Sequence, residues 1–302
     1  MRGSLTGPTC LNTSSHFMFA NLPESDLLRF FYCRWVSPTA RGRVGAALIE
    51  GRGYASESAP TMKFTFLGTR GYIDPRPERH HMHASCKVTY RKTTLVLDRG
   101  EDWLKVPLGF RADAILVTHA HPDHAWGLKK GAPCPVYASE ESWAVMKTFA
   151  IDDRRRALDR QPITLKDITF EAFKVEHSTR APAVGYRITA GRHSIFYAPD
   201  LVYIYDRADA LDGVDVYVGD GSTVDRSFVR KRPDALIGHS PIRTELTWCK
   251  KEGVPLMIVT HCGAQIAGAE DENAVIARIE GFAEERGVKV IVAYDGMEYF
   301  LR

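Results

Sequence analysis

Several short segments of the chain alternate between apolar and polar residues, as strands do when they bury one face. The segment Met62-Lys-Phe-Thr-Phe66 begins the first of them. Ala114-Ile-Leu-Val117 is instead a continuous apolar run, which indicates a strand buried on both faces. Together these patterns predict strands over residues 63–67, 86–90, 94–98, 114–117, 168–175, 183–188, 194–198, 215–218, 256–259, 288–292 and 297–300.

Three further segments have the apolar spacing of helices, at residues 140–149, 242–251 and 271–285. These segments are interleaved with the strands, and several strands follow one another closely enough to form hairpins. Because sheets must cover their apolar faces, this order predicts helices packed outside a pair of facing sheets. The predicted fold class is therefore α/β, an αββα sandwich of two mixed β-sheets.

Residues 1–61 differ from the rest of the chain, with six arginines, no lysine and no sustained apolar period beyond a patch at 27–36. An Arg- and Ser-rich leader is typical of a transit peptide, but four acidic residues interrupt it. Alternatively, Met62 is the true start. We expect residues 1–61 to be a poorly ordered appendage or no part of the native protein, and residues 62–302 to form one folded domain.

Composition and charge exclude several classes of protein. With 302 residues, 44% of them hydrophobic, the chain can bury a sizeable core, and its net charge of +3 creates no overall field toward nucleic acid or membrane. No stretch is long and apolar enough for a membrane span, and no signal peptide is recognisable. No C-x-x-C pair occurs among the cysteines, which argues against a disulfide scaffold or a thiolate zinc site. These observations together predict a cytoplasmic protein. The cysteines are Cys10, Cys33, Cys86, Cys134, Cys249 and Cys262.

The segment Thr118-His-Ala-His-Pro-Asp-His124 directly follows the predicted buried strand 114–117. Alternate residues of an extended loop face the same way, so His119 and His121 can share one metal ion. Asp123 and His124 can then turn toward a second ion. Imidazole and carboxylate ligands without thiolate suit zinc, iron or manganese. Surface histidines in a polar loop are the weaker interpretation, because chance seldom places so many ligand types after a core strand.

Three other candidate ligands also follow predicted strands: His177, Asp200 and His261. Taken singly, each histidine has an ordinary alternative as a hydrogen-bonded core residue, and Asp200 as a turn or capping residue. Because strand ends can converge at one edge of the sheets, all three can meet the 118–124 loop. Their shared placement favours metal ligation.

With these residues the chain resembles the metallo-β-lactamase superfamily, whose H-x-H-x-D-H motif matches residues 119–124. The similarity spans residues 62–302. It implies a hydrolase with two divalent metal ions, zinc in the first place and manganese or iron as alternatives. It would place His119, His121 and His177 on the first ion and Asp123, His124 and His261 on the second, with Asp200 bridging the two.

Within the superfamily, the chain is most similar to the ribonuclease Z and phosphodiesterase branch. The segments that carry this similarity are Leu67-Gly-Thr-Arg-Gly71, Val96-Leu-Asp-Arg-Gly100 and Gly238-His239-Ser240. The resemblance implies phosphodiester hydrolysis by a metal-bridging hydroxide that Asp123 and Asp200 help to hold. His239 would then donate a proton to the leaving oxygen, or else be a capping or core histidine before the next helix.

The chain also departs from ribonuclease Z. The interval from His124 to His177 is too short for the long arm that grips tRNA, so we do not expect a tRNA substrate. In place of a His-Glu pair stands Gly219-Asp220-Gly221, whose aspartate either orients His239 or forms a tight turn, the commoner role between glycines. We expect a small-molecule or nucleotide-type substrate and no membrane partner, and homodimer formation stays open.

Two other functions remain open at this point. The same metal centre is compatible with hydrolysis of a lactone, thioester or β-lactam, because fold and ligands do not fix the bond that is broken. A metal-binding protein without activity is the other hypothesis, although such a protein would be expected to have lost at least one ligand.

Other polar residues have simpler interpretations. We expect Asp98 to be a turn residue or a partner of a ligand rather than a ligand itself. Arg70 fits a solvated side chain, and Arg79–His83 fits a polar loop near the active edge, with substrate contact as an option. The mixed charges of Asp152–Arg156 indicate a solvated helix face.

Overall fold

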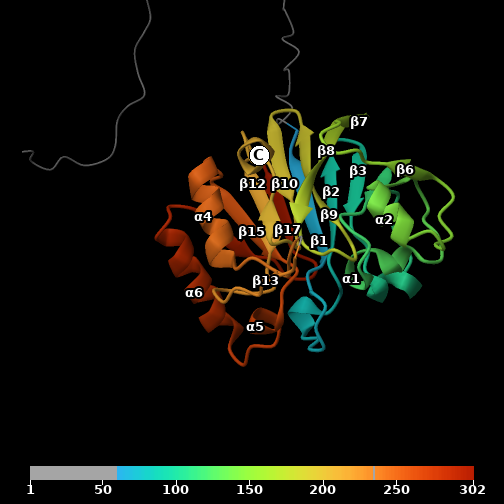
Figure 1. The fold of residues 1–302 in the computed structure, drawn as a ribbon. Coiled ribbons are helices and arrows are strands. Elements are labelled where there is room, and N and C mark those ends of the chain that lie inside the picture. The colour runs from blue at the N-terminus through green and yellow to red at the C-terminus, as the bar shows by residue number, and fades with distance from the viewer. Residues whose placement is uncertain (1–59, 234) are drawn as a thin grey trace, which may run out of the picture. The chain divides into compact units, whose positions relative to one another are not determined.

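The computed structural model describes residues 60–233 and 235–302 (Figure 1). The predicted appendage, residues 1–61, lies almost entirely outside the described residues. The cysteines within the described residues are all free, as a chain without a disulfide scaffold requires: Cys86, Cys134, Cys249 and Cys262.

The first sheet has seven strands, and its two halves differ in direction. Its first four strands pair antiparallel and the remaining ones pair parallel. In spatial order they are β17 (Glu298–Leu301), β1 (Met62–Gly68), β2 (Ser85–Tyr90), β3 (Thr93–Leu97), β4 (Ala114–Leu116), β5 (Val136–Ala138) and β6 (Arg154–Arg156).

The second sheet has eight strands and is also mixed. Its spatial order is β11 (Tyr203–Ile204), β8 (Ile168–Glu176), β9 (Ala183–Ala190), β10 (His193–Tyr197), β12 (Val216–Asp220), β15 (Leu256–Thr260) and β16 (Lys289–Val292), with β7 (Ile163–Leu165) also paired to β8. The last four strands of this order are parallel neighbours. A separate antiparallel pair is formed by β13 (Arg230–Lys231) and β14 (Leu236–Ile237).

Helices lie outside both sheets, as Figure 1 shows. On the side of the first sheet are α1 (Pro122–Ala125) and α2 (Glu140–Val145). On the side of the second are α4 (Ile242–Glu252), α5 (Ala264–Ala267) and α6 (Glu272–Glu284), while α3 (Arg207–Ala210) precedes β12. Short 3-10 helices are η1 (Glu78–His80), η2 (Glu101–Lys105) and η3 (Trp126–Leu128).

Three apolar clusters match these layers. The central one joins residues of both sheets, such as Phe64 of β1 and Phe170 of β8. A second joins the outer face of the second sheet to α4 and α6, and a third joins the outer face of the first sheet to the segment around Met146. The arrangement confirms the predicted αββα sandwich, because each sheet buries both of its faces.

The helix ends follow local rules. Ser139 caps α2 by accepting a hydrogen bond from the Ser142 amide, and Asp271 caps α6 by accepting one from the Ala274 amide. Helix α4 ends at Gly253, whose φ of 75° lies in the left-handed region that favours glycine.

Each predicted strand has a counterpart, and so do the helices predicted at residues 140–149, 242–251 and 271–285, but the strands β5, β6, β7, β11, β13 and β14 are not predicted. All of them are three residues long or shorter, too short for a periodic pattern. The predicted helix face at Asp152–Arg156 is wrong, since Arg154–Arg156 form β6 at the edge of the first sheet. Its exposure to solvent is as expected. Within the described residues, no helix has the length and apolar character to span a membrane.

Candidate metal centre

The loop after β4 brings the H-x-H-x-D-H segment into the site. Thr118, which directly precedes the motif, is held by Asp98, whose carboxylate accepts hydrogen bonds from the Thr118 amide at 2.7 Å and from its hydroxyl. Pro122 stands at the first position of α1, where its missing N–H costs nothing. The chain therefore turns from strand to helix within the motif, which separates His119 and His121 from Asp123 and His124.

The first side of the site contains three converging histidines. His121 Nδ1 lies 3.0 Å from His119 Nε2 and 3.1 Å from His177 Nε2. Asp200 Oδ2 lies 3.6 Å from His119 Nε2. One nitrogen or oxygen of each of these four residues falls within 4.8 Å of the others, so they form one candidate ligand group, which we call the first cluster.

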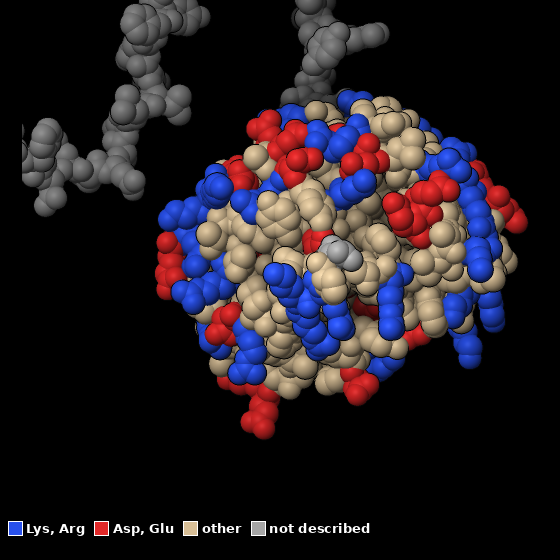
Figure 2. Space-filling view, in the orientation of Figure 1, with Lys and Arg blue, Asp and Glu red and all other residues tan. Residues whose placement is uncertain are grey.

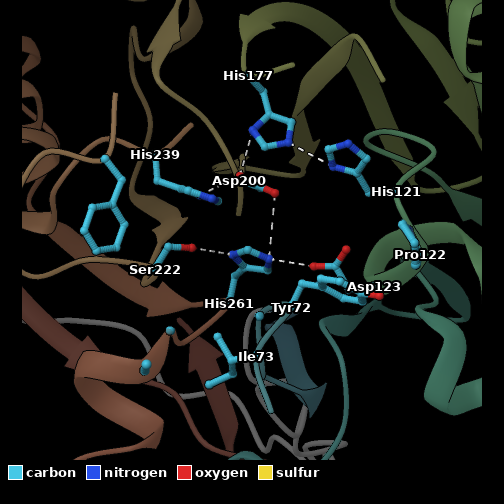
Figure 3. Close-up of a pocket in the computed structure, with 14 residues that line it drawn as sticks. Tyr72, Ile73, His121, Pro122, Asp123, His177, Asp200, Ser222, His239 and His261 are labelled. Atoms are coloured by element: carbon cyan, nitrogen blue, oxygen red, sulfur yellow. Dashed lines mark hydrogen bonds and ion pairs between the residues drawn. The ribbon is translucent and has the colours of Figure 1, made fainter. Parts of the chain in front are cut away.

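The second cluster consists of Asp123, His124, Asp200 and His261. Asp123 Oδ2 lies 3.0 Å from His261 Nε2 and 3.4 Å from His124 Nε2. Asp200 belongs to both clusters, and Figure 3 shows its carboxylate between His177 and His261. The structure thus brings together all seven residues that the sequence predicts as ligands, in the two groups that the resemblance implies.

A third group lies beside them and contains Asp200, Asp220, His239 and His261. His239 Nδ1 is 2.9 Å from both Asp200 Oδ1 and Asp220 Oδ2. Asp220 is fully buried at the end of β12, so the interpretation of this residue as a simple turn is wrong. The alternative of a helix-capping His239 is also wrong, because α4 has Pro241 at its N-cap and no side-chain cap.

The histidines also have partners on the side away from the site. His124 Nδ1 donates to Asp98 at 3.0 Å, and Asp98 is fully buried, as expected for a partner of a ligand. His261 Nδ1 lies 3.0 Å from the Ser222 hydroxyl and 3.4 Å from Asp220. Such partners fix the orientation of an imidazole and the nitrogen that it offers to a metal ion.

The charges of these buried groups depend on one another. Burial opposes the ionised form of Asp123, but His124 and His261 hold the pKa of this carboxyl well below its usual value. Burial, reinforced by His177, lowers the pKa of His121 to about 4, so its ring is neutral at pH 7. Burial also opposes the charged form of His261, yet Asp200, Asp123 and Asp220 raise its pKa to about 9. A metal ion would have to displace that proton.

The donor atoms fit divalent metal ions. His124 Nε2 is buried and makes no hydrogen bond within the described part of the chain, although it faces Asp123 and Asp200. A buried nitrogen without a partner is costly, and a cation at this point would satisfy it. Imidazole and carboxylate donors without thiolate are the set that zinc, iron and manganese accept.

Both clusters open into one pocket of about 450 Å³. Figure 3 shows His121, His177, His239 and His261 around it, with Tyr72 and Ile73 on its lower side. Phe228 also lines the pocket. The apolar lining from Tyr72 and Phe228 is not predicted from the sequence, since neither residue stands in a recognisable motif.

One sequence prediction near the pocket is wrong. Arg70 is 1% exposed rather than solvated, because its guanidinium donates to Asp102 at 2.5 Å and to the Ile73 carbonyl. The histidines at 80 and 83 are buried as well: His80 contacts Thr69 and Glu272, and His83 pairs with Asp102. Neither histidine lines the pocket, and these contacts stabilise the loop, which agrees with the expected polar loop near the active edge.

Comparison with known proteins agrees with this geometry. The sequence profile described as beta-lactamase superfamily domain matches residues 93–262. The metallo-beta-lactamase fold protein YhfI from Bacillus subtilis aligns over 80% of this chain and 99% of its own, with a TM-score of 0.60 and 18% identity. A diphosphatase from the PhnP family aligns over 79% of this chain and 97% of its own, with a TM-score of 0.58 and 21% identity. At such identities the likeness shows the fold alone.

A curated relative shares more sequence over a shorter stretch. Exodeoxyribonuclease WalJ from Streptococcus pneumoniae is 31% identical over 116 residues, which are 35% of this chain and 43% of the relative. The match therefore spans less than half of that protein. The profile match covers more than half of the chain, and the two sheets, the outer helices and the His/Asp clusters agree with it: the chain belongs to the beta-lactamase superfamily and has the metallo-β-lactamase fold.

Proposed function

We propose that the protein is a phosphodiester hydrolase that works with two divalent metal ions. The observation that carries the proposal is His239, which lines the same pocket as both clusters and lies 2.9 Å from Asp200 and from Asp220. The names exodeoxyribonuclease and diphosphatase, given to two similar proteins, denote phosphate chemistry and support the same choice of substrate.

We assign the metal ligands by cluster. His119, His121 and His177 would hold one ion, Asp123, His124 and His261 the other, and Asp200 would contact both. Two divalent ions bound there would supply a hydroxide nucleophile at neutral pH and would neutralise charge on the substrate oxygen. Zinc is the first candidate, and manganese or iron are compatible with the same donors.

The protein's own side chains would handle the leaving group. The buried Asp220 carboxylate accepts a hydrogen bond from His239 Nδ1, which fixes the ring at the pocket wall. With Nδ1 engaged, Nε2 is the nitrogen left to give a proton to the leaving oxygen. Asp123 and Asp200 are ionised, since surrounding histidines hold the pKa of each carboxyl well below its usual value. They can therefore orient an attacking water.

The pocket wall suits a substrate with an apolar or planar substituent. Tyr72, Ile73 and Phe228 line the pocket beside the charged groups. Apolar side chains there would exclude water from the reacting phosphorus and cover the group attached to it.

The full chain should be purified, its metals counted by mass spectrometry, and its activity measured on bis-p-nitrophenyl phosphate, a chromogenic β-lactam and a lactone. Two ions per chain and diesterase activity are expected. Asp123→Ala should lose one ion and the activity, whereas His239→Ala should keep both ions and lose roughly 10²- to 10⁴-fold in kcat, the range for a proton donor. His81→Ala removes an exposed histidine outside the pocket and should match the wild type.

Metal-loaded protein that hydrolyses only the lactone or the β-lactam would contradict the phosphodiester proposal and favour the alternative substrates. Loaded protein without activity on any of the three would favour a metal-binding protein without catalysis. Unchanged activity in His239→Ala would remove this histidine from the mechanism.

A further inference from the structure

A hairpin rich in exposed cations borders the pocket. We call residues 226–233 and 235–237 the basic hairpin; they contain β13 and β14. Four of its side chains are exposed cations, and none has a carboxylate partner among the described residues: Arg226, Arg230, Lys231 and Arg232. In Figure 2, Lys and Arg side chains gather over β13, beside the hollow in the middle of this face. Other surface arginines, such as Arg160 and Arg278, do form ion pairs.

Hydrogen bonds tie this hairpin to the metal centre. β14 leads directly into Gly238 and His239, and the Gly238 amide donates to the His177 carbonyl at 3.0 Å. Where the hairpin begins, the Phe228 amide donates to the His239 carbonyl at 3.4 Å. Gly238 has a φ of 114°, and a Cβ there would lie 2.1 Å from the Phe228 oxygen, so only glycine fits. The cations are therefore held at a fixed place beside the pocket.

Exposed aromatic rings lie among these cations. Tyr72 is 67% exposed and Phe228 41% exposed, and both line the catalytic pocket. Tyr203 and Tyr205, 41% and 45% exposed, line a groove of about 330 Å³ along the hairpin. Lys231 and Arg232 are on the same groove. Large exposed aromatic side chains that gather in concave surfaces mark sites where a ligand or a partner binds.

We propose that the basic hairpin binds the phosphates of single-stranded nucleic acid and leads the strand to the pocket, where Phe228 and Tyr72 stack against a base. The proposal rests on the phosphodiesterase function and names its substrate class. Cations that follow a backbone, alternating with rings that stack on bases, are the combination that single strands require. A duplex keeps its bases stacked on each other and offers no ring face to these side chains.

Among the described residues, one acidic side chain lies on the same groove and restricts the path of the strand. The Glu176 carboxylate accepts hydrogen bonds from the Tyr205 hydroxyl and from the Leu236 amide. Glu176 also lines a second pocket, on the other side of His177, together with Glu140, Glu141 and Asp159. Its four carboxylates outnumber the one cation on it, Lys174, and disfavour phosphates, so the strand should pass over the hairpin side of His177.

Binding can be measured separately from hydrolysis. The metal-loaded full chain is titrated into a fluorescent, hydrolysis-resistant phosphorothioate oligothymidylate of about 20 nucleotides, and fluorescence anisotropy is followed at several salt concentrations. In R230A/K231A/R232A, we expect affinity to fall at least about tenfold and the salt slope to fall by about 2, at roughly 0.7 per phosphate contact on a single strand. Phe228→Ala should weaken binding about tenfold, with little change in salt slope.

The matched control is K92A/R192A/K250A, which removes three exposed cations that form no ion pair with any other described residue. Lys92 and Arg192 lie in the turns that begin β3 and β10, at the strand ends opposite the site. The control should bind like the wild type. Circular dichroism confirms that each variant is folded.

Hydrolysis then separates the two proposals. We expect R230A/K231A/R232A to lose at least about tenfold in kcat/KM on unmodified oligothymidylate and to stay within about twofold on bis-p-nitrophenyl phosphate. Equal binding by both triple variants, preference for duplex over single strand, or binding to anionic vesicles in place of oligothymidylate would overturn this inference. Wild-type protein that cleaves bis-p-nitrophenyl phosphate but not oligothymidylate would overturn it too, while failure on every diester would instead reject the phosphodiesterase function.

Discussion

The first and second clusters share Asp200, but their histidines are supported by different kinds of group. In the first cluster, His119 contacts the Thr118 hydroxyl at 3.1 Å and His177 contacts the Gly238 carbonyl at 3.3 Å. In the second, His124 pairs with the Asp98 carboxylate at 3.0 Å, and His261 has Asp220 at 3.4 Å besides Ser222. The shared Asp200 also lies 2.9 Å from His177 Nδ1. Apart from Asp200, the first cluster therefore has neutral partners and the second has carboxylates.

This difference determines how each side behaves without a metal ion. A carboxylate behind an imidazole makes the ring more basic and a stronger ligand. Burial opposes the charged ring of His124, but Asp123 and Asp98 raise its pKa well above the ordinary value, whereas burial leaves His121 with a pKa of about 4. The second cluster should thus depend strongly on its outer carboxylates, and the first cluster should depend little on outer partners.

Removing the shared ligand should have the largest effect on metal content and activity. It should also abolish the difference between the two clusters in their dependence on outer partners. Asp200→Ala takes a carboxylate from both clusters, so we expect loss of metal from both sides. Activity should fall by more than the roughly 100-fold upper range for loss of an outer partner. Mass spectrometry gives the metal content, and Asp152→Ala, an exposed aspartate, is the control. Retention of one tightly bound ion would mean that Asp200 belongs to a single cluster.

The outer carboxylate of the second cluster provides the next test. Asp98→Asn keeps the shape but removes the charge behind His124, and asparagine tolerates the positive φ of 58° at this position. We expect the affinity of the second cluster to fall about 10- to 100-fold and that of the first to stay unchanged. Competition with a chromophoric chelator resolves the two affinities. Thr118→Ser, which keeps the hydroxyl beside His119, should leave both unchanged, and a loss at the first cluster in Asp98→Asn would refute the difference.

A glycine beside His261 allows a test of the second cluster with a smaller expected effect than the two substitutions above. A Cβ at Gly71 would lie 3.2 Å from His261 Cε1 and 3.3 Å from its Nε2, so the ring must shift by a few tenths of an ångström. Since a 1 Å misplacement can cost about 10²-fold, we expect Gly71→Ala to lose about two- to tenfold in kcat, through the second cluster alone. Gly281→Ala, where an added Cβ meets nothing within 4 Å, is the control. Equal weakening of both clusters would show that the clusters are mechanically coupled.

Much of the fold and the ligand set can be predicted from the sequence for a physical reason. Long strands carry a clear apolar pattern, and ligands placed directly after them meet at one edge of the sheets. His119 to His124 are local in sequence, and His177, Asp200 and His261 each follow a strong strand. Their convergence therefore needs only the topology of the two sheets.

What the sequence fails to predict depends on partners far along the chain. The local sequence around Asp220 fits a turn, but a segment after β14 places His239 against this residue. The local sequence around Arg70 fits a solvated side chain, but Asp102, 32 residues later, pairs with it. The edge strand β6 has three consecutive arginines and no apolar alternation, so its pairing with β5 has no local pattern. In each case a tertiary contact decides between two locally acceptable states.

The carboxylate support of the second cluster extends outward to Glu245, where the smallest effect is expected. Glu245 is fully buried and accepts hydrogen bonds from the Tyr217 hydroxyl and the Asp220 amide. Burial, reinforced by Asp220, raises the pKa of Glu245 well above its ordinary value of 4.5. A raised folded pKa means that the folded state holds the proton longer than the unfolded state does. The stability that Glu245 contributes is then fully present below about pH 4.5 and is lost as the pH rises toward the folded pKa.

Glu245→Gln should therefore flatten the fall of unfolding free energy between pH 5 and 8 that the wild type shows. At pH 5 the variant should stay within about 1.5 kcal/mol of the wild type, the scale of one hydrogen bond, because the amide still accepts from Tyr217 and Asp220. Urea unfolding at a series of pH values measures both quantities, and Glu284→Gln, on the surface of α6, is the control. An unchanged pH slope would mean that Glu245 is ionised in the folded protein. The carboxylate charges behind His261 would then include Glu245 on α4 as well as Asp220.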